Sequence, residues 1–425
     1  MFLQIHTLTS YHATLLNRDD AGLAKRIPFG DQPRLRVSSQ CLKRHWRMAL
    51  QNHLDLPFGL RTRHFFEREI LGRLVNERGL PENTARDLTE TLVGLLLQKS
   101  DKPKAGPAKR AKKPAPAEPE LDLGDDSEND AAASQTQASG LQVKQPILFG
   151  KPEADFLVGL LAQCAAEGSG AKPALQAILK KDKANFTALL RQAGHGNLFA
   201  GVEGALFGRF VTSDILARAD AAVHVAHAFS VHALDTEVDY FTVVDDLNRD
   251  EETGAAHAGD MELGSGVFYG YVAVDIPLLV SNFTGCDANT WRDQNPAQVR
   301  ATLHALARAI TTVTPGAKLG ATAPYAYSDF LLLETGGQQP RSLANAFLKS
   351  IKPRDDLIQQ GINALATHLT AQEGMFGPTA DLRTLATTGN WPHNQPRPQP
   401  LDQAVGQILD AIFGAEPHAS ATPTL

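Results

Sequence analysis

The sequence has few cysteines and no long apolar run. Its three cysteines, Cys41, Cys164 and Cys286, lie far apart among 425 residues, without the CxxC spacing of zinc and redox sites. Because an odd number of thiols cannot pair fully within one chain, we expect free cysteines in a reducing compartment. No segment approaches the roughly 18 consecutive apolar residues of a membrane span, and the N-terminal MFLQIHTLTS lacks the basic region of a signal peptide. These absences predict a cytoplasmic protein.

Motifs of nucleotide and hydrolytic chemistry are missing as well. There is no GxSxG, Walker-type or GxGxxG loop in the sequence. His224, His227 and His232 lie among apolar residues, which favours ordinary structural histidines over a metal site. We therefore expect no cofactor and no bound metal.

Two pairs of adjacent acids leave an enzymatic alternative open. Asp19-Asp20 and Asp245-Asp246 fall in turn-like stretches, and paired carboxylates can hold the metal ions of phosphodiester cleavage. The alternative function is then a metal-dependent ribonuclease that uses Asp19, Asp20 or Asp245. Aspartates in loops more often act as caps and turn formers, so a protein without catalytic residues is the leading hypothesis.

The overall charge argues weakly against nucleic-acid binding, but one segment favours it. The chain carries 41 Lys and Arg against 47 Asp and Glu, a net charge of −6. The segment RLRVSSQCLKRHWR at 34–47 nevertheless contains no acid. Its five basic residues are Arg34, Arg36, Lys43, Arg44 and Arg47. Such a local strip is sufficient for phosphate contacts, whatever the global charge.

The same segment has the pattern of a strand that leads into a helix. Alternation over Pro33–Ser38 places Arg34 and Arg36 on one face. From residue 39 the apolar residues recur at helical spacing, and the other three basic residues lie toward the opposite side. Ser38 or Ser39 can cap this helix, whose unpaired N–H groups favour phosphate. The segment therefore predicts a phosphate-binding strip, with a solvated helix face as the alternative.

The rest of the chain mixes strands and helices. We expect strands over 2–9, 238–244, 264–275 and 330–334, helix-rich stretches over 61–98 and 153–195, and helices over 299–312 and 342–351. The stretch 219–233 is compatible with strand or helix, and 245–263 suits a projecting loop or hairpin. Residues 100–145 are rich in proline, alanine and charge, which predicts a disordered insertion. Toward the C-terminus, beyond about residue 390, we expect helices and a frayed tail.

Aromatic residues in two of the expected strands offer a second sign of RNA binding. They are Tyr240, Phe241, Phe268, Tyr269 and Tyr271. Proteins that bind single-stranded RNA stack bases on such side chains. Alternating aromatics in a strand more often belong to a core, and both interpretations stay open at this point.

Seven motifs then occur in a fixed order along nearly the whole chain. They are IHTLTSY at 5–11, LNRDD at 16–20, RVSSQCLKRHWR at 36–47, HAFSVHALDTEVDYFTVVDDL at 227–247, SGVFYGYVAVD at 265–275, PGAK at 315–318 and RSLANAF at 341–347. In this order they resemble the CasC family, the repeated backbone subunit of the type I-E CRISPR Cascade complex.

The resemblance implies an α+β fold with three parts. An RRM-like (ferredoxin-like) palm would comprise residues 1–57, 200–239 and 265–425. Helical fingers would span 58–199, and a β-hairpin thumb would span 240–264. The insertion at about 100–145 has no counterpart in this pattern.

The resemblance also implies the function of a non-catalytic scaffold that binds crRNA and oligomerises along it. The thumb would kink the guide and present its segments for pairing with a target DNA strand, and the partners would be crRNA, target DNA, other copies of the chain and other Cascade subunits. By position, the expected crRNA-backbone contacts are Arg18, Ser38, Gln40, Lys43, Arg44, Arg47 and Lys318. Phe210 would pack at the kink, and Tyr240, Phe241 and Thr242 would form the thumb base. Arg34 and Arg36 are added on charge and alternation alone.

Overall fold

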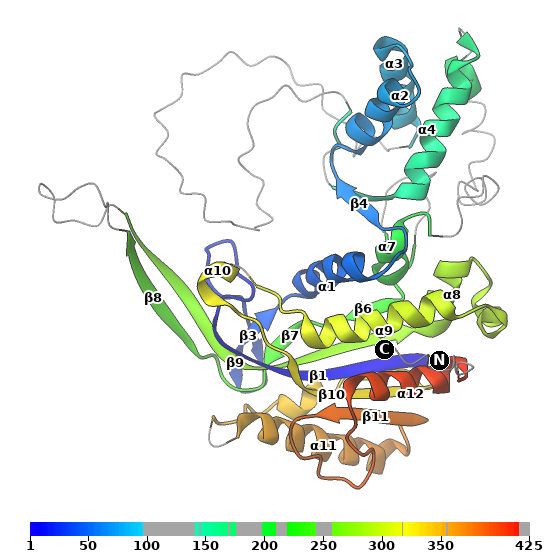
Figure 1. Cartoon of the computed structure of the whole chain (residues 1–425). Coiled ribbons are helices and arrows are strands. Elements are labelled where there is room, and N and C mark those ends of the chain that lie inside the picture. The colour runs from blue at the N-terminus through cyan, green and yellow to red at the C-terminus, as the bar shows by residue number, and fades with distance from the viewer. Residues whose placement is uncertain are drawn as a thin grey trace, which may run out of the picture.

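The protein is built around one antiparallel sheet. The computed structural model describes residues 1–96, 141–143, 146–168, 171–175, 198–209, 219–243, 257–316, 318–353 and 356–415. The main sheet has nine strands in the order β11-β10-β1-β9-β7-β3-β2, with β6 and β8 also paired to β9. Helices cover both of its faces (Figure 1). Helices and antiparallel strands are thus mixed in one fold, as expected.

The centre of the sheet is formed by β1 (Phe2–Thr14) and β9 (His257–Asp275). Their antiparallel register runs from Phe2 opposite Asp275 to Thr14 opposite Gly264. Residues 3–9 of β1 are buried on both sides of the strand, because helices pack on each face. On its other edge β1 pairs with β10 (Ser328–Gly336), which pairs with β11 (Leu382–Thr387). The expected strands over 2–9, 264–275 and 330–334 are confirmed, and each is longer than expected.

Four long helices pack on one face of the sheet. They are α1 (Ser39–His53), α8 (Ile276–Thr284), α9 (Ala297–Thr312) and α12 (Leu401–Phe413). Each buries an apolar stripe, and together with α7 (Gly201–Phe207) they share a core that includes Trp46, Leu306 and Ile408. The turns η3 (Ala288–Asp293) and α10 (Leu319–Thr322) connect elements on this side. The helix expected over 299–312 is confirmed.

The opposite face is covered by α11 (Leu357–Phe376) and the short turn η4 (Ala344–Phe347). Their core includes Leu8 and Phe330 from the sheet and Phe347 and Leu365 from the covering layer. The sheet therefore lies between two separate apolar layers, and α1 and α11 lie on opposite sides of it (Figure 1).

One expectation for the C-terminal part was wrong. The helix expected over 342–351 is reduced to η4, because the backbone N–H of Leu343 donates to the Tyr269 hydroxyl at 3.0 Å and that of Ser350 to Asp31 Oδ1 at 2.8 Å. Side chains distant in sequence thus replace the helical acceptors. Beyond 390 the chain forms the helix α12, because its apolar residues are buried against β11 and α9. Residues 416–425 lie outside the described ranges.

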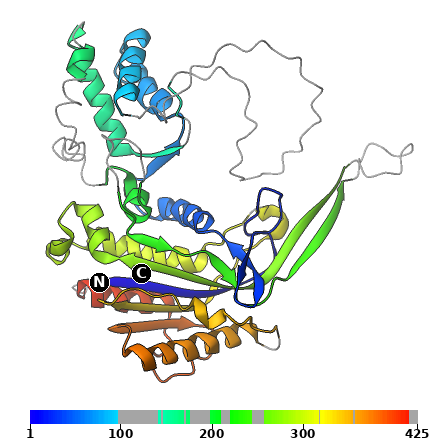
Figure 2. The ribbon, with the colours of Figure 1, turned by 180° about the vertical axis from the view of Figure 1, so that it is seen from behind.

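A helical lobe has its own core beside the sheet (Figure 2). It contains the π-helical turn η1 (Phe65–Leu71), α2 (Gly72–Asn76), α3 (Glu82–Leu96) and α4 (Lys151–Ala165). The lobe joins the body through a ribbon of β4 (Gly59–Thr62) and β5 (Ile147–Gly150). The expected helix-rich character of 61–98 and 153–195 is confirmed where the chain is described. The insertion expected at 100–145 lies outside the described residues except for 141–143.

A long hairpin projects from the sheet. Here β8 (Thr236–Val243) pairs with the first half of β9, from Thr236 opposite Gly264 to Val243 opposite His257, and the ribbon extends beyond the other strands (Figure 2). The stretch 219–233 forms two short strands, β6 (Val223–Val225) and β7 (Ala228–Ser230), so the strand interpretation is correct. The edge of the sheet is completed by β3 (Gln32–Val37) and β2 (Arg26–Phe29).

The structure also describes the cysteines and the apolar character of the helices. None of the three thiols of Cys41, Cys164 and Cys286 is joined in a disulfide. No helix within the described ranges is long and apolar enough to cross a membrane.

Candidate nucleic-acid interface

The start of α1 is fixed by Ser38. Its backbone is extended, and its hydroxyl accepts a hydrogen bond from the Cys41 N–H at 3.3 Å, which makes it the N-cap. The Ser38 N–H donates to Asn17 Oδ1 at 3.0 Å, so the 17–25 loop is held against the helix start. Ser38 is buried. Its observed role is to position the helix, and a direct phosphate contact by its hydroxyl stays a prediction.

The basic side chains of α1 lie on the side away from its core. Leu42, Trp46 and Leu50 are buried, whereas the expected contacts are partly or fully exposed. These contacts are Gln40, Lys43, Arg44 and Arg47. The Lys43 ammonium lies 5.6 Å from the centre of the Phe207 ring. Partial burial, and then the positive charge of Arg61, lower the pKa of Lys43. Lys43 therefore occupies a site whose local field favours an added anion.

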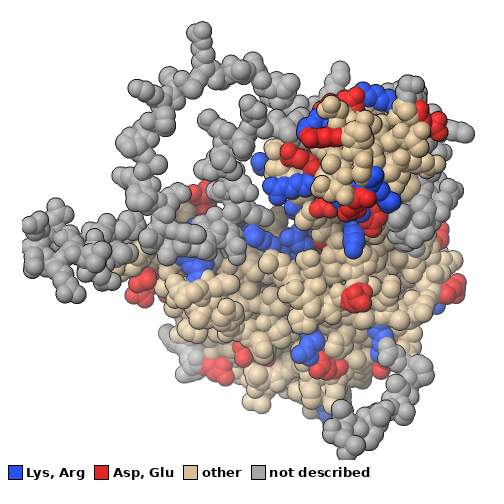
Figure 3. All heavy atoms as spheres, turned by 45° about the horizontal axis from the view of Figure 1, so that its top comes forward, with Lys and Arg blue, Asp and Glu red and all other residues tan. Residues whose placement is uncertain are grey.

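The lobe adds cations that sequence reasoning missed. Arg61 in β4 and Arg63 just after it are both exposed, and Arg61 lies close enough to Lys43 to affect its pKa. Burial raises the pKa of Glu203, although Arg47 and Arg61 act against that rise. Figure 3 shows Lys and Arg side chains gathered where the lobe meets the body. The signal was present in the sequence: Arg-Thr-Arg at 61–63 alternates as a strand does, so both arginines share a face.

The structure corrects the expected phosphate contact of Arg34. The side chain is fully buried, and its guanidinium donates to the carbonyl of Ser230 at 3.2 Å and to that of Phe347 at 2.8 Å. It also donates to Asp31 Oδ1 at 3.3 Å. Its donors bind the protein itself, so the expected phosphate contact is wrong for this residue. Alternation placed Arg34 on one face but could not show that another layer covers that face.

Arg36 and Arg18 lie beside the helix start. The Nε atom of Arg36 is buried and has no hydrogen-bond partner among the described residues. Burial, and then the charges of Arg36 and Lys25, lower the pKa of His227, whose Nδ1 accepts from the Ser39 N–H at 3.1 Å. Arg18 forms an isolated bridge with Ala24 in the loop that Asn17 holds against α1. These cations surround the N-terminal end of α1.

The base of the projecting hairpin brings together three of the expected contacts. Tyr240 is 67% exposed and Thr242 is exposed, whereas Phe241 is partly buried. The ammonium of Lys318 lies 5.7 Å from the centre of the Phe241 ring, so the loop before α10 contacts the hairpin. Phe210 lies outside the described residues. The aromatics of β9 divide differently: Phe268 and Tyr269 are buried in the two cores, which favours the core interpretation for them.

Of the carboxylates of the enzymatic alternative, the structure gives a turn-forming role to Asp19. Asp19 Oδ1 accepts from the N–H groups of Ala21 and Leu23 at 2.9 and 3.0 Å, which is the turn-forming role of a loop aspartate. Asp245 lies outside the described residues. Within the described part of the chain no three His, Cys, Asp or Glu side chains lie close enough together to hold a metal ion.

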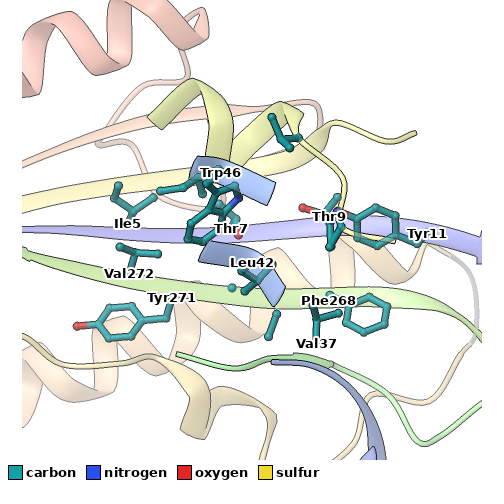
Figure 4. Close-up of a pocket in the computed structure, with 15 residues that line it drawn as sticks. Ile5, Thr7, Thr9, Tyr11, Val37, Leu42, Trp46, Phe268, Tyr271 and Val272 are labelled. Atoms are coloured by element: carbon teal, nitrogen blue, oxygen red, sulfur yellow. The ribbon is translucent and has the colours of Figure 1, made fainter. Parts of the chain in front are cut away.

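A small cavity lies beneath α1, between the helix and the sheet (Figure 4). Its volume is about 40 Å³, and its walls include Thr7, Thr9, Trp46 and Phe268. That volume holds a few water molecules at most. The cavity is therefore too small to hold a nucleotide.

Comparison with known proteins identifies the family of the chain. The family model of the CT1975-like proteins matches residues 3–411. The chain belongs to the CT1975-like protein family. No curated protein matches the chain.

Two solved structures extend the comparison of this CT1975-like protein. One, from a "CRISPR RNA-guided surveillance complex, pre-nicking", is 25% identical with a TM-score of 0.71 and covers 97% of this chain and 100% of its own. The other, from a "CRISPR RNA-guided surveillance complex", is 19% identical with a TM-score of 0.55 and the same coverage, and it shows the fold alone. Together with the family match, the first of these structures confirms the resemblance to the CasC-type backbone proteins.

Proposed function

We propose that this CT1975-like protein is a crRNA-binding backbone subunit of a Cascade-like surveillance complex of type I-E in the cytoplasm. The observation that carries the proposal is the basic strip on α1 and β4. Lys43, Arg44 and Arg47 lie on one side of α1, and Arg61 of the lobe lies close to Lys43. Such a strip binds consecutive phosphates electrostatically and without regard to base sequence.

The hairpin of β8 and β9 supports the second half of the proposal. It projects from the sheet, and the side chains at its base include the exposed Tyr240 and the Phe241–Lys318 contact. A protruding ribbon can reach a neighbouring copy and interrupt the guide at regular intervals. Head-to-tail contacts between copies would then give an open filament along one RNA. Base pairing between the guide and the target DNA would then provide sequence recognition. The strip itself would not need to recognise any base.

In this proposal the sheet and its covering helices are the RRM-like palm, the helical lobe is the fingers and the hairpin is the thumb. The role is non-catalytic, and the other partners are target DNA, further copies and other subunits of the complex. The turn-forming role of Asp19 favours this scaffold over the ribonuclease.

The proposal is tested by expressing the chain with its neighbouring genes and sequencing the RNA that co-purifies with it. A uniform small RNA with a repeat-derived end supports the proposal, and the absence of RNA at moderate salt contradicts it. Incubation of the complex with complementary RNA and Mg²⁺ tests the non-catalytic role separately. Regularly spaced cleavage products would establish the ribonuclease instead.

A further inference from the structure

Two tyrosines next to β10 are among the most exposed large side chains of the described residues. Tyr325 and Tyr327 are each 74% exposed, although they flank Ala326, which packs against the main core. Exposure thus alternates along 325–327, with a residue that faces the core between two exposed rings. Both phenol rings are therefore open to solvent.

The backbone beneath the rings is held in place. The Ala326 N–H donates to Thr314 Oγ1 at 3.1 Å, and the same hydroxyl donates back to the Ala326 carbonyl at 3.3 Å. Two residues further on, the Ser328 hydroxyl is hydrogen-bonded to that of Thr9 at 2.7 Å. Because these contacts fix the segment before any ligand arrives, binding on the rings costs little additional ordering.

The segment belongs to the loop that carries Lys318. The side chains of Leu319 and Pro324 both lie close to Gly316, where an added Cβ atom would be about 3 Å from each. Lys318 and the tyrosines therefore leave one compact loop, and Lys318 contacts Phe241 at the base of the hairpin. Figure 1 places α10 beside that base, on the side of the sheet where α1 lies.

We propose that Tyr325 and Tyr327 form a stacking platform for unpaired bases of the guide RNA, where it passes from α1 to the hairpin. This inference rests on the proposed function and adds a stacking contact with the flat faces of bases. Aromatic rings beside a cation are the combination that binds single-stranded RNA, because rings stack on bases of any sequence while the cation contacts phosphate. Lys318, which leaves the same loop, supplies a cation for phosphate that an apolar contact with another protein would not need.

The experiment measures binding of the full chain to a fluorescein-labelled single-stranded RNA and to the same RNA with abasic sites. The double variant Tyr325→Ala/Tyr327→Ala should weaken binding of the intact RNA by about tenfold or more, and it should no longer distinguish intact from abasic RNA. Tyr325→Phe/Tyr327→Phe should retain binding, because it keeps both rings. Met375→Ala/Phe376→Ala is the matched control, since it removes two equally exposed side chains at the end of α11.

The outcomes separate the two proposals. If Lys43→Ala/Arg44→Ala weakens RNA binding but the tyrosine variants do not, the platform is refuted and the proposed function stands. If the tyrosine variants change only self-association of the chain, the rings contact a second copy, which also refutes the platform. If the unaltered chain, alone and in its complex, binds no RNA, the proposed function fails and the platform fails with it.

Discussion

The buried guanidinium of Arg34 donates a 2.8 Å hydrogen bond to the backbone carbonyl of Phe347. The contact joins strand β3 to the turn η4, which are 313 residues apart in sequence. A second donor of the same group binds the Ser230 carbonyl at the end of β7. Arg34 therefore connects three segments near the edge of the sheet, and its charge serves the fold.

We expect Arg34→Met to lower the free energy of unfolding by about 2–4 kcal/mol, because it leaves two backbone carbonyls with reduced hydrogen bonding in the interior. Arg34→Lys should not restore stability, since one ammonium cannot reproduce the planar set of donors. Urea denaturation monitors both variants. Arg308→Ala is the control: it removes an exposed ion pair with Asp402 and should cost less than about 1 kcal/mol. Equal small losses for Arg34→Met and the control would contradict the structural role.

The double variant Lys43→Ala/Arg44→Ala tests the strip. We expect about tenfold weaker binding of single-stranded RNA, whatever its sequence, because phosphate contacts carry no base information. The slope of log K against log salt should fall by about 1.4, since each lost phosphate contact on a single strand contributes about 0.7. Fluorescence anisotropy at several salt concentrations measures both quantities.

The control for the strip removes the same charge elsewhere. Lys352→Ala/Arg397→Ala deletes two exposed cations from segments beside the core on the α11 side of the sheet. Its RNA affinity and salt slope should stay close to those of the unaltered chain. If the two double variants behave alike, the α1 strip is only part of a general field.

Arg61 tests whether the lobe contributes. Its charge acts on Lys43, so Arg61→Ala should weaken RNA binding and at the same time raise the pKa of Lys43 toward its ordinary value. Arg86→Ala, which removes an exposed cation from α3, should change neither. Binding measurements together with NMR titration of the Lys43 ammonium check the two effects. Unchanged affinity in Arg61→Ala would confine the interface to α1.

The sequence predicted local structure well and long-range environment poorly. The period of apolar residues placed α1, α9 and the central strands, because each pattern reflects which face is buried. Arg34 and Lys43 have the same charge and lie nine positions apart, yet one is buried and the other is partly exposed. The difference arises from Ser230 and Phe347, whose proximity no local pattern contains. Arg61 was missed for the same reason, since its closeness to α1 depends on how the lobe packs.

A buried network on β1 and β10 predicts how stability depends on pH. His6 and Glu334 are fully buried, and His6 Nε2 lies 3.1 Å from Glu334 Oε2. Arg341 and Arg383 bind the same carboxylate at 2.7 and 2.6 Å. Burial alone would raise the pKa of Glu334, but hydrogen bonds from His6 and Arg341 hold it well below its usual range. Burial lowers the pKa of His6 despite its bond to Glu334, so the ring is neutral and donates from Nε2.

Below pH 6.5 the unfolded chain takes up a proton at His6 that the folded chain does not. The free energy of unfolding should therefore decrease as the pH is lowered, by up to about 1.4 kcal/mol per pH unit from this group. The contribution of Glu334 is present above about pH 4.5, the ordinary pKa of its carboxyl, and is lost only as pH falls further. His6→Gln, which keeps a donor for Glu334, should therefore flatten the profile between about pH 6.5 and 5 and leave the steeper loss at lower pH. Other buried histidines are present in both proteins, so the difference between the two urea-denaturation profiles isolates His6. Parallel profiles across that window would mean that His6 is protonated in the folded chain and pairs with Glu334 as a cation.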